Sequence, residues 1–109
     1  MVGSTVPAMA QTVSFDITVP GDILSQRAEK ADSEQRFYVT GNSFNKSGTL
    51  RCTSINRNNS AIRSNTANIR PDKLSGSASY QRTAPSGEYY YMTTSASVSN
   101  LHVTGRYTP

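Results

Sequence analysis

Apolar residues alternate with polar residues near both ends of this chain, and this pattern constrains the fold more than any other feature. The alternating apolar positions are Val13, Phe15, Ile17, Val19, Leu101, Val103 and Tyr107. Successive side chains of a β-strand point to opposite sides, so a period of two is typical of a strand with one buried and one solvated face. Both ends of the chain are therefore predicted to be strands.

The length and composition indicate one small folded domain. The chain has 109 residues, of which 35% are hydrophobic and 17% are charged, and about a third are Ser, Thr or Asn. Disordered chains combine high net charge with few aromatic and β-branched residues. Six Tyr, three Phe and the alternating segments favour a folded domain instead. Because Trp is absent and the hydrophobic fraction is low, the core is expected to be a single apolar layer.

Short strand-like segments separated by turn residues fill the rest of the chain. The expected strands are residues 11–19, 35–40, 49–55, 74–83, 88–94 and 100–108, with a weak edge strand in 60–68. The expected turns and loops are 20–21, 41–43, 45–48, 56–60, 84–87 and 95–99. Such spacing predicts a single antiparallel β-sandwich of six to seven short strands, with a small open barrel as the alternative. Residues 22–34 are polar and are predicted to form either a short helix or a loop.

The same alternation gives a candidate core. It contains Val13, Phe15, Ile17, Val19, Phe37, Val39, Leu50, Cys52, Ile62, Tyr80, Tyr90, Met92, Leu101 and Val103.

Residues 1–10 differ from the rest of the chain. Ala8-Met9-Ala10 has the small-residue pattern of a signal-peptide cleavage site, although the basic and long apolar parts of a signal are missing. We interpret residues 1–10 as a signal-peptide remnant or disordered leader, and residues 11–109 as the β domain. The protein is therefore expected to be secreted or at the cell surface. No stretch is long and apolar enough to cross a membrane as a helix.

Charge is distributed unevenly along the chain. Residues 1–34 hold five acidic and two basic residues, a net −3, whereas residues 35–109 hold nine basic and two acidic residues, a net +7. A basic surface attracts polyanions such as anionic envelope polymers. The alternative is an ordinary solvated surface, because the basic residues are scattered and do not form a run.

The residues that carry most enzyme and metal chemistry are scarce. Cys52 is the only cysteine, so no intrachain disulfide is possible, and its alternation with Leu50 predicts a small buried side chain. His102 is the only histidine and falls on the solvated face of its strand. A Cys52–His102 dyad is disfavoured because the two side chains are expected to face opposite ways. The sequence therefore predicts no enzyme activity, no metal and no cofactor.

A run of three tyrosines is the most distinctive local feature. Alternation places Tyr89 and Tyr91 on the outer face of a strand and Tyr90 in the core. With Arg82 and Arg106 nearby, the outer pair would form an aromatic and cationic patch for sugars, peptides or bases. The alternative is cross-strand pairing that only stabilises the sheet. No specific nucleic-acid partner is expected, because ribonucleoprotein aromatic motifs are absent and lysines are few.

The C-terminal third carries a family resemblance. The segments Ser75–Tyr80, Gly87–Tyr91 and Val103–Pro109 are similar to those of small, uncharacterised exported proteins of Gram-positive bacteria, which resemble lactococcin-type secreted bacteriocins. The resemblance implies a small β-sandwich with an alternating N-terminal strand and a final strand that ends in proline. It implies no site residues.

Two functions of different classes are predicted from these observations. The first is an exported, non-enzymatic protein that acts at a bacterial cell surface, either by binding an envelope polymer or surface protein or in the manner of a bacteriocin. The second is a structural subunit that self-assembles into a surface layer or particle, because a Thr-, Ser- and Tyr-rich sheet with few charges suits assembly by strand pairing. The oligomeric state is left open.

Overall fold

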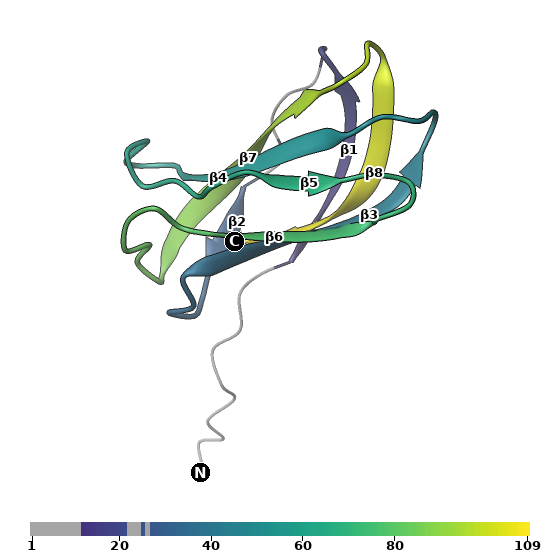
Figure 1. Ribbon diagram of the computed structural model, residues 1–109. Helices are drawn as coiled ribbons and strands as arrows, with labels where there is room; N and C mark the ends of the chain where they lie inside the picture. Colours follow the sequence, from purple (N-terminus) through teal and green to yellow (C-terminus); the bar gives the residue numbers. More distant parts are fainter. Residues whose placement is uncertain (1–11, 22–24, 26) are drawn as a thin grey trace.

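The protein is an all-β sandwich. The computed structural model describes residues 12–21, 25 and 27–109, and these contain eight strands and no helix (Figure 1). The strands are β1 (Val13–Val19), β2 (Ala28–Lys30), β3 (Arg36–Phe44), β4 (Leu50–Asn56), β5 (Ala67–Ile69), β6 (Ser75–Ser79), β7 (Glu88–Ala96) and β8 (Leu101–Thr108). The predicted antiparallel sandwich is confirmed, with eight strands where six to seven were expected. Residues 1–10, the predicted leader, lie outside the described residues.

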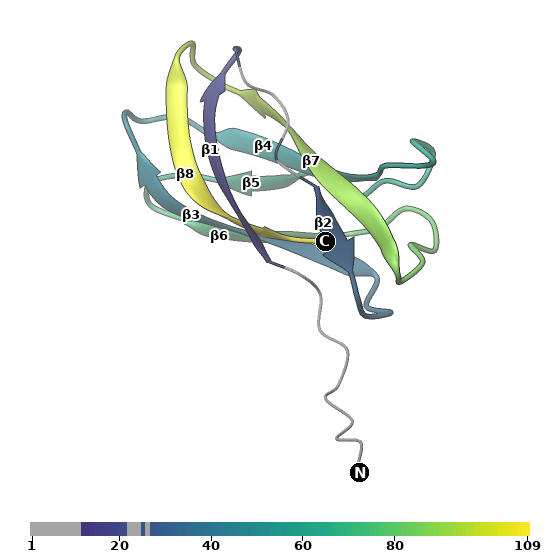
Figure 2. The same cartoon turned by 180° about the vertical axis from the view of Figure 1, so that it is seen from behind.

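Two four-stranded sheets face each other across the core (Figures 1 and 2). Sheet A has the order β1-β8-β3-β6 and sheet B has the order β2-β7-β4-β5, with every pairing antiparallel. The sheets do not close on each other, so the alternative of a barrel is not adopted. The two segments whose alternation was clearest, β1 and β8, are paired, with Val13 opposite Tyr107 and Val19 opposite Leu101.

The predicted core is largely correct, because period-two alternation is a local property that survives folding. Of the predicted core residues, Ile62 is the exception, since it is only partly buried against the cluster. The core also holds a hydroxyl network in which the Ser54 hydroxyl lies 2.8 Å from the Tyr80 hydroxyl and 2.6 Å from the Tyr107 hydroxyl. Among the described side chains, no fully buried nitrogen or oxygen lacks a hydrogen-bond partner.

The prediction of a helix or a loop for residues 22–34 is wrong for part of this segment. Its described part forms neither a helix nor only a loop, because Ala28–Lys30 adds β2 to the edge of sheet B. Lys30 is fully buried, and its ammonium group lies 3.1 Å from an Asp32 carboxylate oxygen, donates to the Glu34 carbonyl and lies 5.2 Å from the centre of the Tyr80 ring. Lysine side chains are normally exposed to solvent. Lys30 can be buried because its charge is paired with the Asp32 carboxylate and a backbone carbonyl, which offsets the cost of removing it from water. Residues 22–24 and 26 lie outside the described residues.

Strand β3 continues through residues 41–43, where a turn was predicted. The pairing with β8 shifts by one residue between Gly41 and Ser43, so Asn42 is an extra residue in a β-bulge. The long partner strand β8 explains the error, because its continuous ladder holds β3 extended beyond the Gly-Asn-Ser signal. The described residues include no helix that is long and apolar enough to span a membrane.

Candidate functional site

The four residues of the predicted aromatic and cationic patch do not meet on one surface. Tyr89 and Tyr91 face outward from sheet B on β7, as alternation predicted, with Tyr89 40% exposed and Tyr91 half-buried. Arg106 faces outward from sheet A on β8, on the other side of the sandwich. Arg82 is exposed in the loop between β6 and β7. Although β7 and β8 are consecutive, the chain crosses from one sheet to the other between them, so their outer faces point in opposite directions.

Tyr89 has a different cationic neighbour from those predicted. The guanidinium carbon of Arg27 lies 5.0 Å from the centre of the Tyr89 ring, at cation–π distance, and Glu29 lies opposite Tyr89 in the pairing of β2 with β7. The sequence interpretation missed Arg27 because it precedes β2, a strand within the segment expected to be helix or loop. Cross-strand contacts of this kind stabilise the sheet, which agrees with the alternative interpretation of the tyrosine run.

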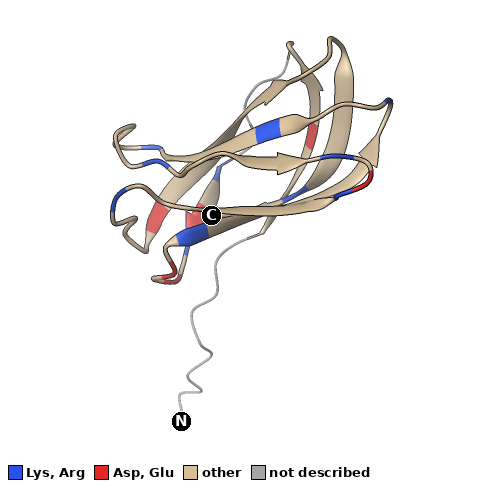
Figure 3. Ribbon diagram, in the orientation of Figure 1, with Lys and Arg blue, Asp and Glu red and all other residues tan. Residues whose placement is uncertain are grey.

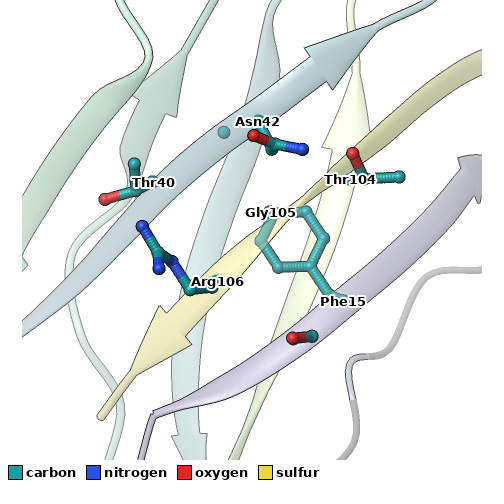
Figure 4. Close-up of a pocket in the computed structure, with 8 residues that line it drawn as sticks. Phe15, Thr40, Asn42, Thr104, Gly105 and Arg106 are labelled. Carbon is teal, nitrogen blue, oxygen red and sulfur yellow. The ribbon is translucent and has the colours of Figure 1, made fainter.

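A depression of about 350 Å³ lies on sheet A around Arg106 (Figure 4). Its lining residues are Ser14, Phe15, Thr40, Gly41, Asn42, Thr104, Gly105 and Arg106. They come from the three neighbouring strands β1, β8 and β3, as Figure 4 shows. We name this surface the Arg106 depression. Of its members, the sequence analysis singled out only Arg106 as a site residue.

The floor of the Arg106 depression is formed where three strands approach closely. Gly105 is opposite both Phe15 on β1 and Gly41 on β3. A Cβ atom on Gly105 would overlap the Thr40 carbonyl oxygen and lie 2.7 Å from the Phe15 Cζ atom. The strands therefore meet at this point without intervening side chains from β8, and the adjacent bulge at Asn42 adds an amide to the rim.

Arg106 is a cation among neutral hydrogen-bonding groups. Its cross-strand neighbours on the outer face are Ser14 and Thr40. The ion pairs between described residues are Lys30–Asp32, Arg70–Asp72 and His102–Asp16, and none involves Arg106. A guanidinium group offers a planar fork of donors that matches a carboxylate or phosphate, while hydroxyl and amide groups hydrogen-bond to ligand hydroxyls. This arrangement suits a ligand that is both anionic and rich in hydroxyl groups.

A second depression continues the polar surface toward the far edge of sheet A. It has a volume of about 510 Å³ and lies over β3, β6 and the start of β5. Arg36 and Lys73 contribute cations to its lining, and the Arg36 Nε–H donates to the Ser77 hydroxyl at 3.0 Å. Ser75, which also lines it, is paired with Thr40 of the Arg106 depression. The two depressions are therefore neighbours on one side of the molecule.

The charge asymmetry of the sequence does not produce an acidic and a basic half. Figure 3 shows acidic and basic residues intermixed over the described strands and loops. The pairing of the N-terminal strand with the C-terminal strand explains this mixing. On the outer face of sheet A, a carboxylate oxygen of Asp16 lies 2.5 Å from His102 Nε2. Both side chains are partly exposed, and the exposure of His102 agrees with the prediction.

Cys52 is buried and unpaired, as the sequence predicted. Burial raises the pKa of its thiol to about 12, because the thiolate would lose its hydration in the core. His102 faces outward from sheet A, whereas Cys52 faces inward from sheet B, so the two do not form a dyad. The part of the chain that the structure describes holds no group of three or more His, Cys, Asp or Glu residues placed to bind a metal ion.

Comparisons with protein-family models, curated proteins and solved structures gave no match to this chain. The fold and the geometry of the Arg106 depression are therefore the basis for considering its function.

Proposed function

We propose that this protein is an exported, non-enzymatic binding module that recognises an anionic, hydroxyl-rich polymer of the bacterial cell envelope. The observation that carries the proposal is the position of Arg106. It stands without a carboxylate partner among the described residues and is surrounded by hydroxyl and amide groups in an open depression. An acidic polysaccharide or a polyol phosphate polymer presents the complementary groups, an anion next to several hydroxyls.

The extent of the polar surface supports a polymer as the ligand. The Arg106 depression and the neighbouring depression around Arg36 and Lys73 are open and shallow, and both lie on the same side of the sandwich. Pockets for small molecules are usually concave and mostly apolar, and they bury most of the ligand. A repeating polymer can instead gain affinity from several weak contacts along a flat sheet. An exported protein with a resemblance to Gram-positive secreted proteins would meet such polymers outside the cell.

Co-sedimentation with isolated Gram-positive cell walls tests this proposal. The wild-type chain is expected to pellet with walls at low salt and to be released at high salt, because salt screens the contact between exposed charges. Arg106→Gln removes the charge and keeps hydrogen-bonding capacity, and it is expected to weaken binding by about tenfold, in line with the loss of one charge-assisted contact. Walls stripped of their phosphate polymers distinguish a polyol phosphate ligand from an acidic polysaccharide.

Arg51→Gln is the matched control. Arg51 is also an exposed arginine at the outer face of a strand with two neighbours, but that strand is β4 in sheet B. Its replacement changes the net charge by the same amount and leaves sheet A intact, so wall binding is expected to stay close to that of the wild type. Equal binding by Arg106→Gln and wild type, or equal losses in the two variants, would remove the Arg106 depression as the binding site. Growth inhibition in parallel cultures would identify the binding as bacteriocin-like.

A further inference from the structure

The outer strands of the two sheets differ in how well their free edges are protected. Natural sheets prevent edge-to-edge pairing with short edge strands, inward-pointing charges, bulges, prolines or covering segments. Strand β2 is three residues long and directs the charged Lys30 into the core. Strands β5 and β6 are three and five residues long and lie against each other, so that a Cβ atom on Gly76 would lie 3.1 Å from the Asn68 carbonyl oxygen.

Within the part of the chain that the structure describes, strand β1 has none of these protective features. It is seven residues long, and its inward-facing side chains are all apolar. Its one charged residue, Asp16, faces outward and contacts His102. Between Val13 and Val19 there is no Lys, Arg, Pro or Gly, and the pairing with β8 has no bulge. No described residue pairs with the outer edge of β1, which is the border of sheet A in Figure 2.

We infer that β1 is a self-association edge, at which two copies of this chain pair β1 with β1 in antiparallel orientation. The pairing joins the two A sheets into one continuous sheet. The partner is a second copy because an unprotected edge is satisfied best by a strand of the same length and alternation, and β1 itself is such a strand. Antiparallel pairing of a strand with its own copy also gives the closed two-fold symmetry of most homodimers.

Charge complementarity selects the register. Pairing that is centred on Asp16 places the two Asp16 carboxylates opposite each other, which is unfavourable. Pairing that is centred on Phe15 places Ser14 opposite Asp16 of the second copy, where the hydroxyl can donate to the carboxylate. Because Ser14 is also opposite Arg106 in its own sheet, Arg106 and Asp16 of the second copy share one row. Their backbones are then about 10 Å apart, two strand spacings, which an arginine side chain spans.

The dimer is expected to be weak. Pairing along one short strand buries much less surface than a standard stable interface. Association is therefore expected to depend on concentration between the micromolar and the millimolar range. The proposal is tested without any ligand, so its failure is distinguishable from a failure of envelope binding.

Sedimentation equilibrium of the full chain, without ligand and over this concentration range, tests the inference. The wild type is expected to shift from monomer to dimer as concentration rises. Ser14→Glu places an introduced carboxylate opposite Asp16 of the second copy twice per dimer, and it is expected to weaken association by about tenfold. The fold should be retained, because the introduced carboxylate also lies beside Arg106 of its own chain. Thermal unfolding of the variant confirms that the fold is intact.

Two further variants test whether the dimer forms through β1 and whether its pairing is centred on Phe15. The double variant Ser14→Glu with Asp16→Lys restores opposite charges across the pair and is expected to recover association. Thr93→Glu adds the same charge to the outer face of the central strand β7 in sheet B, and it is expected to dimerise like the wild type. A wild type that stays monomeric up to millimolar concentration, a Ser14→Glu variant that dimerises like the wild type, or a double variant that fails to recover would each overturn the inference.

Discussion

Individual residues in this protein behave according to the partners that folding gives them. Lys30 is fully buried because Asp32 and a backbone carbonyl pair with its ammonium group. Arg106 is exposed and has no carboxylate partner within the described part of the chain. Cys52 behaves as a small apolar side chain, since the core around it disfavours the thiolate. These environments decide which residues are chemically available at the surface.

The Cys52 thiol is expected to be inert in the folded protein. With a pKa of about 12 in place of the ordinary 9.0, only about 1 in 10,000 molecules carries a thiolate at pH 8, against about one tenth for an ordinary thiol. A thiol-specific reagent at pH 8 should therefore label the native chain slowly and the urea-unfolded chain rapidly. Rapid labelling under native conditions would contradict the buried position of Cys52.

At the scale of strands, the packing of sheet A and the shape of the Arg106 depression depend on the close approach of β1, β8 and β3. Gly105 lies where Phe15 and Gly41 face each other across β8, and the bulge at Asn42 begins beside it. This arrangement shapes the Arg106 depression, in which β8 contributes no side chain at position 105. The sequence showed a glycine within an alternating strand, but it did not show which neighbours would approach it.

Gly105→Ala is expected to destabilise the fold by at least about 2 kcal/mol, since an added methyl group meets backbone and a packed ring that cannot both move. Urea unfolding gives the free energy of unfolding for comparison with the wild type. Gly21→Ala is the matched control. Among the described residues, only the Thr18 carbonyl oxygen lies near a Cβ atom built there, at 3.5 Å, so the change should stay within about 0.5 kcal/mol. Equal stability of the two variants would show that the strands tolerate a side chain at position 105.

At the scale of the whole molecule, the space between the sheets holds phenol groups that must stay protonated. Burial raises the pKa of the Tyr80 hydroxyl, and it raises the pKa of the Tyr107 hydroxyl well above its usual value. Both hydroxyls meet at Ser54 in the centre of the sandwich. The fold therefore contains groups that ionise more easily in the unfolded chain than in the native state.

Stability is expected to fall in alkaline solution. A group whose pKa is raised in the folded state contributes its full stabilisation below its unfolded pKa and loses it as the pH rises toward its folded pKa. The loss should begin near pH 9 for Cys52 and near pH 10 for Tyr80 and Tyr107, at about 1.4 kcal/mol per pH unit for each group. Urea unfolding between pH 7 and pH 11 measures this slope, and Tyr107→Phe should reduce it. A flat profile above pH 10 would show that these phenols ionise in the folded protein.

Most of the candidate site could not be predicted from the sequence, because alternation shows which way a side chain faces but not which sheet its strand joins. Alternation identified Arg106, Tyr89 and Tyr91 as outward-facing residues, and the structure agrees. It could not assign their strands to sheets, so it placed residues from opposite sides of the sandwich in one patch. Arg27, the residue that contacts Tyr89, was missed because β2 is only three residues long and has too few positions to show a period.

The sequence by itself determined the class of fold, the strands at both ends and most of the core. These follow from period-two alternation and turn residues, which act between neighbours along the chain. Only the tertiary structure decided which strands share a sheet, that Lys30 turns inward, that β3 continues through its bulge, and that no described residue pairs with the outer edge of β1. These features depend on pairing between residues far apart in the chain, and no local pattern encodes such pairing.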